Sequence, residues 1–166
     1  GTCAMRNEKE LAKALDVPEY VLKPKTNEAD PLGIMQVIRT EIQAQGSNLR
    51  ERSCALGHHY SYLSVQLAQL ENGNAISTAS ASKLLAAAGM QITVNDLPLN
   101  HPEVLKLAQS LKPQYTELAR QLGIDRRTLQ RALEGKPQPR SNHLIHAWRA
   151  AGQRIGISRL VPQELE

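Results

Sequence analysis

The chain of 166 residues contains no phenylalanine and a single tryptophan, and aromatic residues make up only 3% of it. A core can still form, because 41% of the residues are hydrophobic, but it must be built from Leu, Ile, Val and Ala. Such a core favours packed helices over a β-sandwich, where aromatic and β-branched residues predominate. The composition therefore predicts an all-α fold.

Long apolar runs are also missing. No stretch approaches the ~20 apolar residues of a membrane-spanning helix, and no secretory signal is visible. The two cysteines, Cys3 and Cys54, are far apart in the sequence. Free thiols in a reducing compartment are therefore expected rather than a disulfide, and we expect a cytoplasmic protein.

The residue groupings of enzymes are absent from the sequence. No nucleophile, base and orienting acid occur together, and there is no Gly-rich phosphate loop. Of the five histidines only His143 and His146 have helical spacing, and no cysteine or carboxylate completes a zinc set with them. We expect no catalytic residues, no metal and no cofactor.

Charge is unevenly distributed along a chain whose net charge is +4. Residues 1–30 carry five basic and six acidic side chains, and residues 31–100 carry four of each. Residues 101–166 carry eleven basic and six acidic side chains, a local net charge of +5. The positive field thus lies on the C-terminal part, as a surface that binds phosphate requires.

The stretch Tyr115 to Gly135, YTELARQLGIDRRTLQRALEG, has the pattern of two helices joined by a tight turn. Thr116 is expected to cap the first helix, and Gly123 to end it in the left-handed conformation. Asp125 is expected to cap a second helix over residues 126–134. The apolar positions that join the two helices are Leu118, Ala119, Leu122, Ile124, Leu129 and Leu133.

This spacing resembles the helix-turn-helix of the phage repressor and Cro-like family, the xenobiotic-response-element group. In such motifs the start of the second helix contacts bases in the major groove, so the resemblance implies double-stranded DNA as the partner. Tyr115 departs from the family, which usually has a Gln there that braces the helix on phosphate. An ordinary amphipathic helix pair with a solvated basic face is the alternative. The DNA-facing side chains would be Arg126, Arg127, Gln130 and Arg131.

A weaker match to the same family lies upstream, from Asn48 to Ser64. Its tail, L-G-x-x-x-S-Y-L-S, carries the turn and the start of a second helix. Arg52 and Ser53 stand where the first helix of the motif has Leu and Ala, and Cys54 is expected to be a small core residue. The DNA-facing side chains would here be His59, Tyr60, Ser61 and Ser64.

An internal repeat indicates two units. The stretch 70–94 aligns without gaps on the stretch 133–157, with Leu70 opposite Leu133. Each copy has the pattern of a loop, a Ser-capped helix, a Gly cap and a short extended piece. Trp148, in the second copy, is expected to be a core or dimer contact. The predicted organisation is an N-terminal helical segment (1–30), a first unit (31–97) and a second unit (98–166).

The N-terminal segment repeats part of the motif once more, from Glu10 to Lys23, but Pro24 cuts its second helix short. Glu19 and Tyr20 stand in its DNA-facing places, and an anion there is repelled by phosphate. We interpret this stretch as a packing unit, a vestige or the end of a longer protein, and not as a DNA reader.

These patterns predict an all-α fold of two tandem repressor-like helix-turn-helix bundles with a short helical N-terminal segment. The expected function is a sequence-specific double-stranded DNA-binding transcriptional regulator, a repressor of the phage, plasmid or toxin–antitoxin type. Because such units usually act in pairs, a homodimer is expected. The alternative is a helical protein–protein adaptor, antitoxin-like or anti-regulator, that does not bind DNA. The balanced charge of residues 31–100 favours it for the first unit.

Overall fold

The computed structural model describes residues 28–160, so Cys3 and the motif from Glu10 to Lys23 lie outside the described residues. The first half contains α3 (Ile34–Ala44), α4 (Leu49–Ala55), α5 (Tyr62–Glu71), α6 (Thr78–Ala87) and β1 (Met90–Val94). The second half contains β2 (Leu97–Pro98), α7 (Pro102–Ser110), the short 3-10 helix η3 (Lys112–Gln114), α8 (Tyr115–Leu122), α9 (Arg126–Leu133), α10 (Ser141–Ala150) and β3 (Ile155–Arg159).

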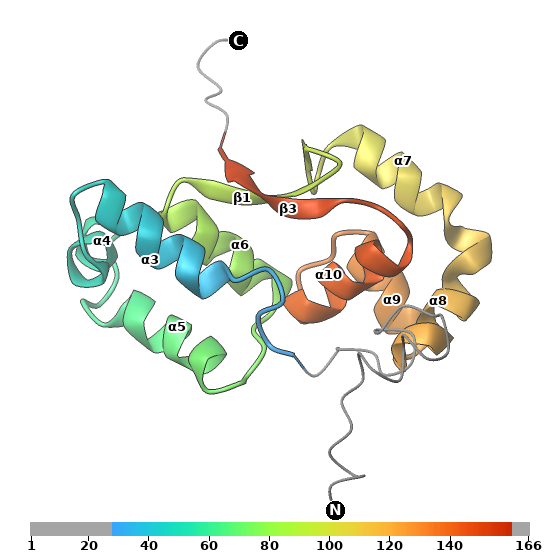
Figure 1. Cartoon of the computed structure of the whole chain (residues 1–166), viewed down its shortest axis with the longest axis horizontal. Coiled ribbons are helices and arrows are strands. Elements are labelled where there is room, and N and C mark those ends of the chain that lie inside the picture. Colours follow the sequence, from blue (N-terminus) through green and yellow to red (C-terminus); the bar gives the residue numbers. More distant parts are fainter. Residues whose placement is uncertain (1–27, 161–166) are drawn as a thin grey trace, which may run out of the picture.

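The helices of the two halves lie on either side of the molecule, with β1 and β3 running across the top of both (Figure 1). None of the helices described here is long and apolar enough to cross a lipid bilayer.

A three-stranded antiparallel sheet in the order β2-β1-β3 corrects the prediction of an all-α fold. The strand β1 pairs with β3 over its whole length, from Met90 opposite Arg159 to Val94 opposite Ile155. Positive φ angles at Asn95–Asp96 turn β1 back into β2 as a tight two-residue hairpin. The β-branched pieces after the two glycine caps were visible in the sequence, but their mutual pairing is long-range and local periodicity does not reveal it.

The two copies of the internal repeat meet where α6 and α10 begin. The backbone N–H of Thr78 donates to the carbonyl oxygen of Pro139, and that of Ser141 donates to the carbonyl oxygen of Ile76, both at 2.8 Å. Thr78 and Ser141 occupy the same place in the two copies, and so do Ile76 and Pro139. The two hydrogen bonds are therefore exchanged between equivalent positions, as across a local two-fold axis.

The helices around this joint are arranged differently in the two halves. In the second half α10 packs against both α8 and α9, whereas in the first half α6 packs against α3. The two halves are therefore equivalent mainly within the repeat itself. The two helix-turn-helix stretches pack against different helices.

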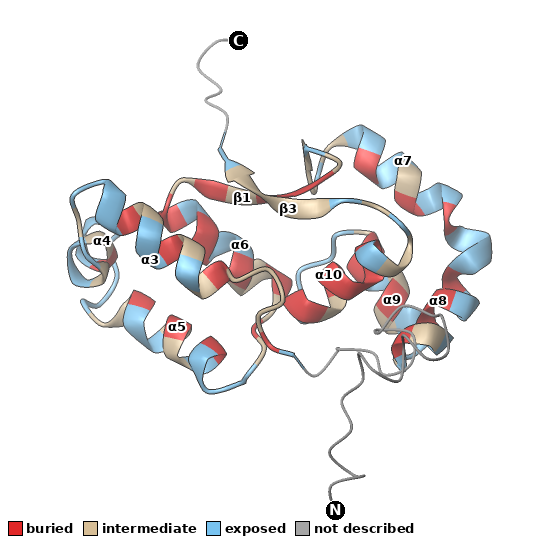
Figure 2. Ribbon diagram, in the orientation of Figure 1, coloured by how far each residue is buried: buried red, intermediate tan, exposed pale blue. Residues whose placement is uncertain are grey.

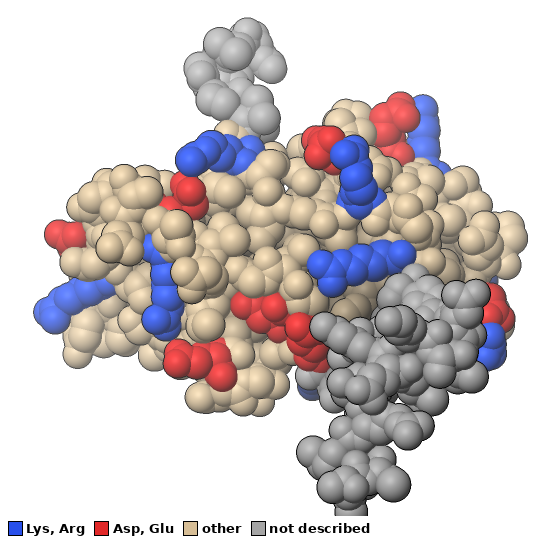
Figure 3. Space-filling model, viewed as in Figure 1, with Lys and Arg blue, Asp and Glu red and all other residues tan. Residues whose placement is uncertain are grey.

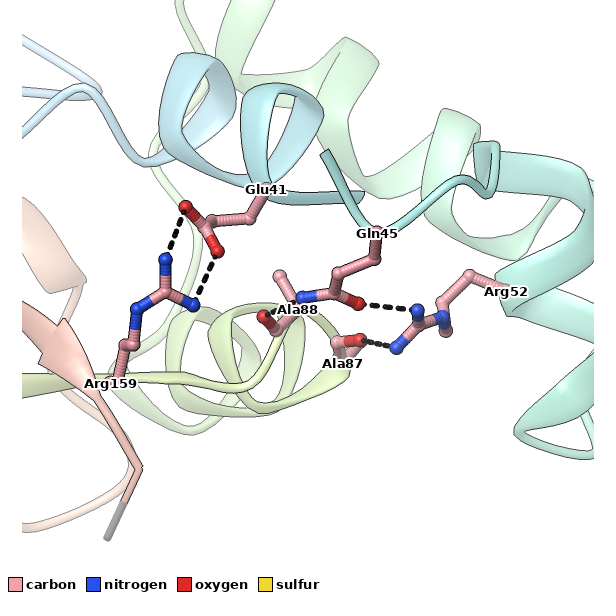
Figure 4. A network of polar contacts seen from close by, with 6 residues as sticks. All are labelled: Glu41, Gln45, Arg52, Ala87, Ala88 and Arg159. Atoms are coloured by element: carbon pink, nitrogen blue, oxygen red, sulfur yellow. Dashed lines mark hydrogen bonds and ion pairs between the residues drawn. The ribbon is translucent and has the colours of Figure 1, made fainter. Parts of the chain in front are cut away.

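Arg52, which stands where the motif has Leu, satisfies the C-terminal end of α6 (Figure 4). Its guanidinium donates to the carbonyl oxygen of Ala87 at 2.9 Å and to the side-chain oxygen of Gln45. The Gln45 amide in turn donates to the carbonyl oxygen of Ala88 at 3.0 Å. Helix-end carbonyls lack partners within the helix, so Arg52 gives the first half a polar connection where the motif has an apolar one.

An ion pair connects the two halves in the same region (Figure 4). The guanidinium of Arg159, on β3, lies 2.9 Å and 3.3 Å from the two carboxylate oxygens of Glu41, on α3. This two-point contact fixes the end of β3 against the first half.

Burial confirms most of the apolar positions predicted for the second helix pair (Figure 2). Leu118, Ala119, Leu122, Leu129 and Leu133 are all buried, and Ile124 is half-buried against the same core. Trp148 is fully buried inside the chain and is a core residue. Cys54 is exposed, so its expected place in the core was wrong.

Candidate nucleic-acid interface

The turn between α8 and α9 has the predicted geometry. Gly123 follows α8 with φ 69°, in the left-handed region, and Asp125 caps α9 by accepting a hydrogen bond from the Thr128 N–H at 2.7 Å. The predicted cap of the first helix was wrong: α8 begins at Tyr115, directly after η3, and no side chain caps it. Thr116 thus lies inside the helix, because the 3-10 helix η3 runs directly into α8.

The carboxylate of Asp125 is held in its charged form. Hydrogen bonds from the backbone N–H and then the hydroxyl of Thr128 lower the pKa of Asp125, and Arg127 lowers it further. A charged acceptor at this position binds the free N–H groups at the start of a helix. The cap therefore fixes the direction in which α9 leaves the turn.

The four predicted side chains of α9 lie close together on its outer side. Arg126, Arg127 and Arg131 are exposed and Gln130 is half-buried. Residues four apart are neighbours on a helix, so Arg127 lies beside Arg131 and Arg126 beside Gln130. Nη1 of Arg126 is 3.5 Å from the side-chain oxygen of Gln130, and the Gln130 amide donates to Glu134 at 3.1 Å.

Arg127 and Arg131 form no ion pair with a carboxylate in the part of the chain that the structure describes. Within residues 28–160 the ion pairs join Arg39 to Glu71, Arg120 to Glu117, Arg154 to Asp96 and Arg159 to Glu41. Two exposed guanidinium groups of α9 therefore face solvent without an ion pair to any described residue, and both can bind an external anion or a base edge.

Tyr115 is turned inward, toward α7. It is buried, and its hydroxyl donates to the carbonyl oxygen of Ala108 at 2.6 Å. Burial, followed by the charge of Glu134, raises the pKa of Tyr115, against the opposing effect of Arg126. The Arg126 guanidinium lies 5.6 Å from the centre of the tyrosine ring. Tyr115 therefore makes a cation–π contact with a side chain of α9.

The first unit places its predicted residues differently. Helix α5 begins at Tyr62, so His59, Tyr60 and Ser61 precede it and only Ser64 lies on the helix. His59 Nδ1 lies 2.8 Å from the hydroxyl of Ser61. The ring of Tyr60 lies under the guanidinium of Arg50, 4.5 Å away. These residues form an aromatic, polar turn rather than the outer row of a recognition helix.

Two features of this unit were missed from the sequence. The buried hydroxyl of Ser53 donates to the carbonyl oxygen of Leu49 at 2.7 Å and accepts the Leu63 N–H at 3.1 Å, which links α4 to the start of α5. The signal for this link in the sequence was a small residue, Ser53, at the position where the two helices cross. The second feature is apolar exposure, which includes Leu56 (46%), Tyr60 (48%) and Val65 (53%).

At least one face of the molecule carries no separate patch of basic side chains. The face in Figure 3 mixes Lys and Arg with Asp and Glu, and α9 is partly hidden behind α10 in this view (Figure 1).

His146 is buried, and burial followed by Arg140 lowers the pKa of His143. Among the described residues no three His, Cys, Asp or Glu side chains come together as a metal site.

Comparison of the chain with family models, with curated proteins and with solved structures gives no match. The assignment of a function therefore depends on the residues and geometry of this chain.

Proposed function

We propose that the protein is a sequence-specific double-stranded DNA-binding transcriptional regulator of the repressor type, acting in the cytoplasm. The observation that carries the proposal is the pair Arg127 and Arg131, exposed on α9 without ion-pair partners among the described residues. Helix α9 follows a tight Gly-containing turn and starts at a capped end. The N-terminal part of such a helix reads base edges in the major groove, and Arg is the commonest specific reader of guanine.

Charge supports the same region as the DNA-binding part. Residues 101–166 carry a net charge of +5, whereas residues 31–100 are balanced. Contacts of Lys and Arg with phosphate supply most of the non-specific affinity for DNA, so the second half is expected to supply most of the binding energy. Repression would follow from occlusion of a promoter and needs no chemistry.

The proposal includes a homodimer of chains. In the described sheet β3 is an edge strand, and an edge strand is able to pair with a second copy. Light scattering of the protein with and without a bound duplex gives the number of chains. Two chains on a palindrome of composite half-sites support the homodimer, whereas one chain on a non-palindromic site rejects it.

A second candidate function is a protein–protein adaptor, and a specific observation favours it for the first unit. Helix α5 contains neither Lys nor Arg. Of the exposed apolar side chains, Leu56 and Tyr60 lie between α4 and α5, and Val65 lies on α5 itself. Exposed apolar surface of this kind is typical of protein interaction sites. The two candidates predict different results for sequence-specific retention on DNA.

Selection of bound sequences from random duplexes tests the proposed function. A regulator enriches a defined sequence, and the complex dissociates steeply as salt is raised. An adaptor enriches no sequence, and any retention on DNA is the same for all duplexes.

A further inference from the structure

A cavity of about 590 Å³ lies between the two halves. Residues of α6, β1 and α7 line it, together with Pro98 of β2, Leu160 after β3 and residues that directly follow α9. This volume falls in the range of small-molecule sites, which are mostly apolar with a few polar groups. The apolar side chains that line it include Ala79, Ala86, Met90, Ile92, Leu105 and Leu160.

Two of the apolar side chains in this wall are left open to solvent. Leu105 is 41% exposed and Leu160 is 45% exposed, and both line the cavity. Water against such a surface is unfavourable, and an apolar body that replaces it gains the free energy of burial. The cavity therefore suits a ligand with a hydrocarbon or aromatic body.

Among the described residues that line the cavity, Glu134 is the only charged one. Its carboxylate accepts a hydrogen bond from the Gln130 amide, and a carboxylate has room for further donors. We propose that this cavity binds a small amphiphilic amine, with its apolar body between α6 and α7 and its ammonium group on Glu134.

The neighbouring surface suggests an alternative head group for the ligand. Lys106 and Lys136 line an adjoining hollow that also includes Glu134. An amphiphile with a carboxylate head would be attracted to these two lysines rather than to Glu134, so the head group of the preferred ligand distinguishes the two arrangements.

Occupation of the cavity has a consequence for α9, and this consequence rests on the proposed function. An ammonium group on Glu134 shares the carboxylate with the Gln130 amide, and Gln130 is one of the proposed DNA contacts. Binding of the amine and binding of DNA are then coupled, and the coupling is equal in both directions.

Displacement of a fluorescent probe tests the site on the full chain. N-phenyl-1-naphthylamine, a neutral apolar probe, should bind saturably with one site per chain. Octylamine should displace it at about fivefold lower concentration than octanol, as a partly exposed ion pair allows, and octanoate should be the weakest of the three. Absence of saturable binding, or octanoate as the strongest competitor, overturns the proposal.

Two pairs of variants locate the site. Glu134→Gln should reduce octylamine to the level of octanol, whereas Glu71→Gln, at the equivalent position of the repeat, should leave the preference unchanged. Ala86→Trp should fill the cavity and abolish probe binding, whereas Ala44→Trp, on the exposed end of α3, should not. An unchanged preference in Glu134→Gln, or full binding by a folded Ala86→Trp variant, contradicts the site.

The coupling is measured separately, as the affinity for a selected duplex with and without saturating octylamine. The wild type should show a changed affinity and Glu134→Gln should not. If the chain binds no duplex, the proposed function fails, while the amine site is still decided by the displacement results.

Discussion

Ser77 and Arg140 pair as an antiparallel bridge, and they occupy the same place in the two copies of the repeat. Ser77 is the N-cap residue of α6 and Arg140 that of α10. Thr93 and Gly156, which lie opposite each other in β1 and β3, are likewise equivalent positions of the two copies. The halves are therefore joined at self-equivalent positions, as the two subunits of an isologous dimer are.

Arg127→Ala should weaken binding to a selected duplex by ~1–3 kcal/mol, because it removes a base or phosphate contact. The position is exposed, so thermal stability should barely change. Fluorescence anisotropy and thermal melting of the same sample measure both effects. Arg149→Ala, which removes an exposed charge at the end of α10, is the control and should bind almost as the wild type does. Unchanged affinity of a folded Arg127→Ala variant would remove Arg127 from the interface.

Binding should depend steeply on salt. If about six phosphates are neutralised, the logarithm of the binding constant should fall with the logarithm of the salt concentration at a slope of about −5. Titrations at four or five salt concentrations give the slope. A slope near zero would favour the adaptor function instead.

Tyr115→Phe should destabilise the fold without affecting DNA binding. The loss is expected at the low end of about 0.5–1.5 kcal/mol, because the Ala108 carbonyl oxygen keeps its hydrogen bond from the Leu111 N–H. Urea unfolding and duplex binding are the two measurements. Tyr60→Phe, at an exposed ring, is the control for stability. A large loss of duplex affinity in folded Tyr115→Phe would contradict the inward orientation of the hydroxyl.

Acid should weaken the cap of α9. The pKa of Asp125 is lower in the folded protein than in the unfolded chain, so its stabilising effect is present above the unfolded pKa of about 4. The effect is lost as the pH falls through the folded value. Asn also caps helices but does not titrate, so the stability difference between wild type and Asp125→Asn should shrink between pH 5 and pH 2.5. A difference that stays constant over this range would argue against the charged cap.

Local signals predicted the second helix pair well. Gly123 and Asp125 were identified from the types of residue that a left-handed turn and a helix start require. Leu129 and Leu133 were placed from their spacing of four. Each of these features depends on neighbours within one turn of helix, so the sequence alone contains the information.

The features that were missed depend on distant parts of the chain. The pairing of β1 with β3 joins the ends of the two repeat copies, which lie far apart in the sequence, and it changed the fold class. Arg52 finds its partners on α6 and at Gln45, and a pattern read along one helix does not show them. The turn before α5 places Tyr60 outside the helix, because the helix starts later than the alignment with α9 implied.

The most direct test of the proposed function compares two charge-matched double variants on one selected duplex. Arg127→Ala with Arg131→Ala removes two charges from α9, and Arg149→Ala with Arg154→Ala removes two exposed charges elsewhere. At a fixed salt concentration, the first variant should lose roughly a hundredfold in affinity and the second less than about threefold. Equal losses in the two variants, or full affinity in the first, would contradict DNA recognition by α9.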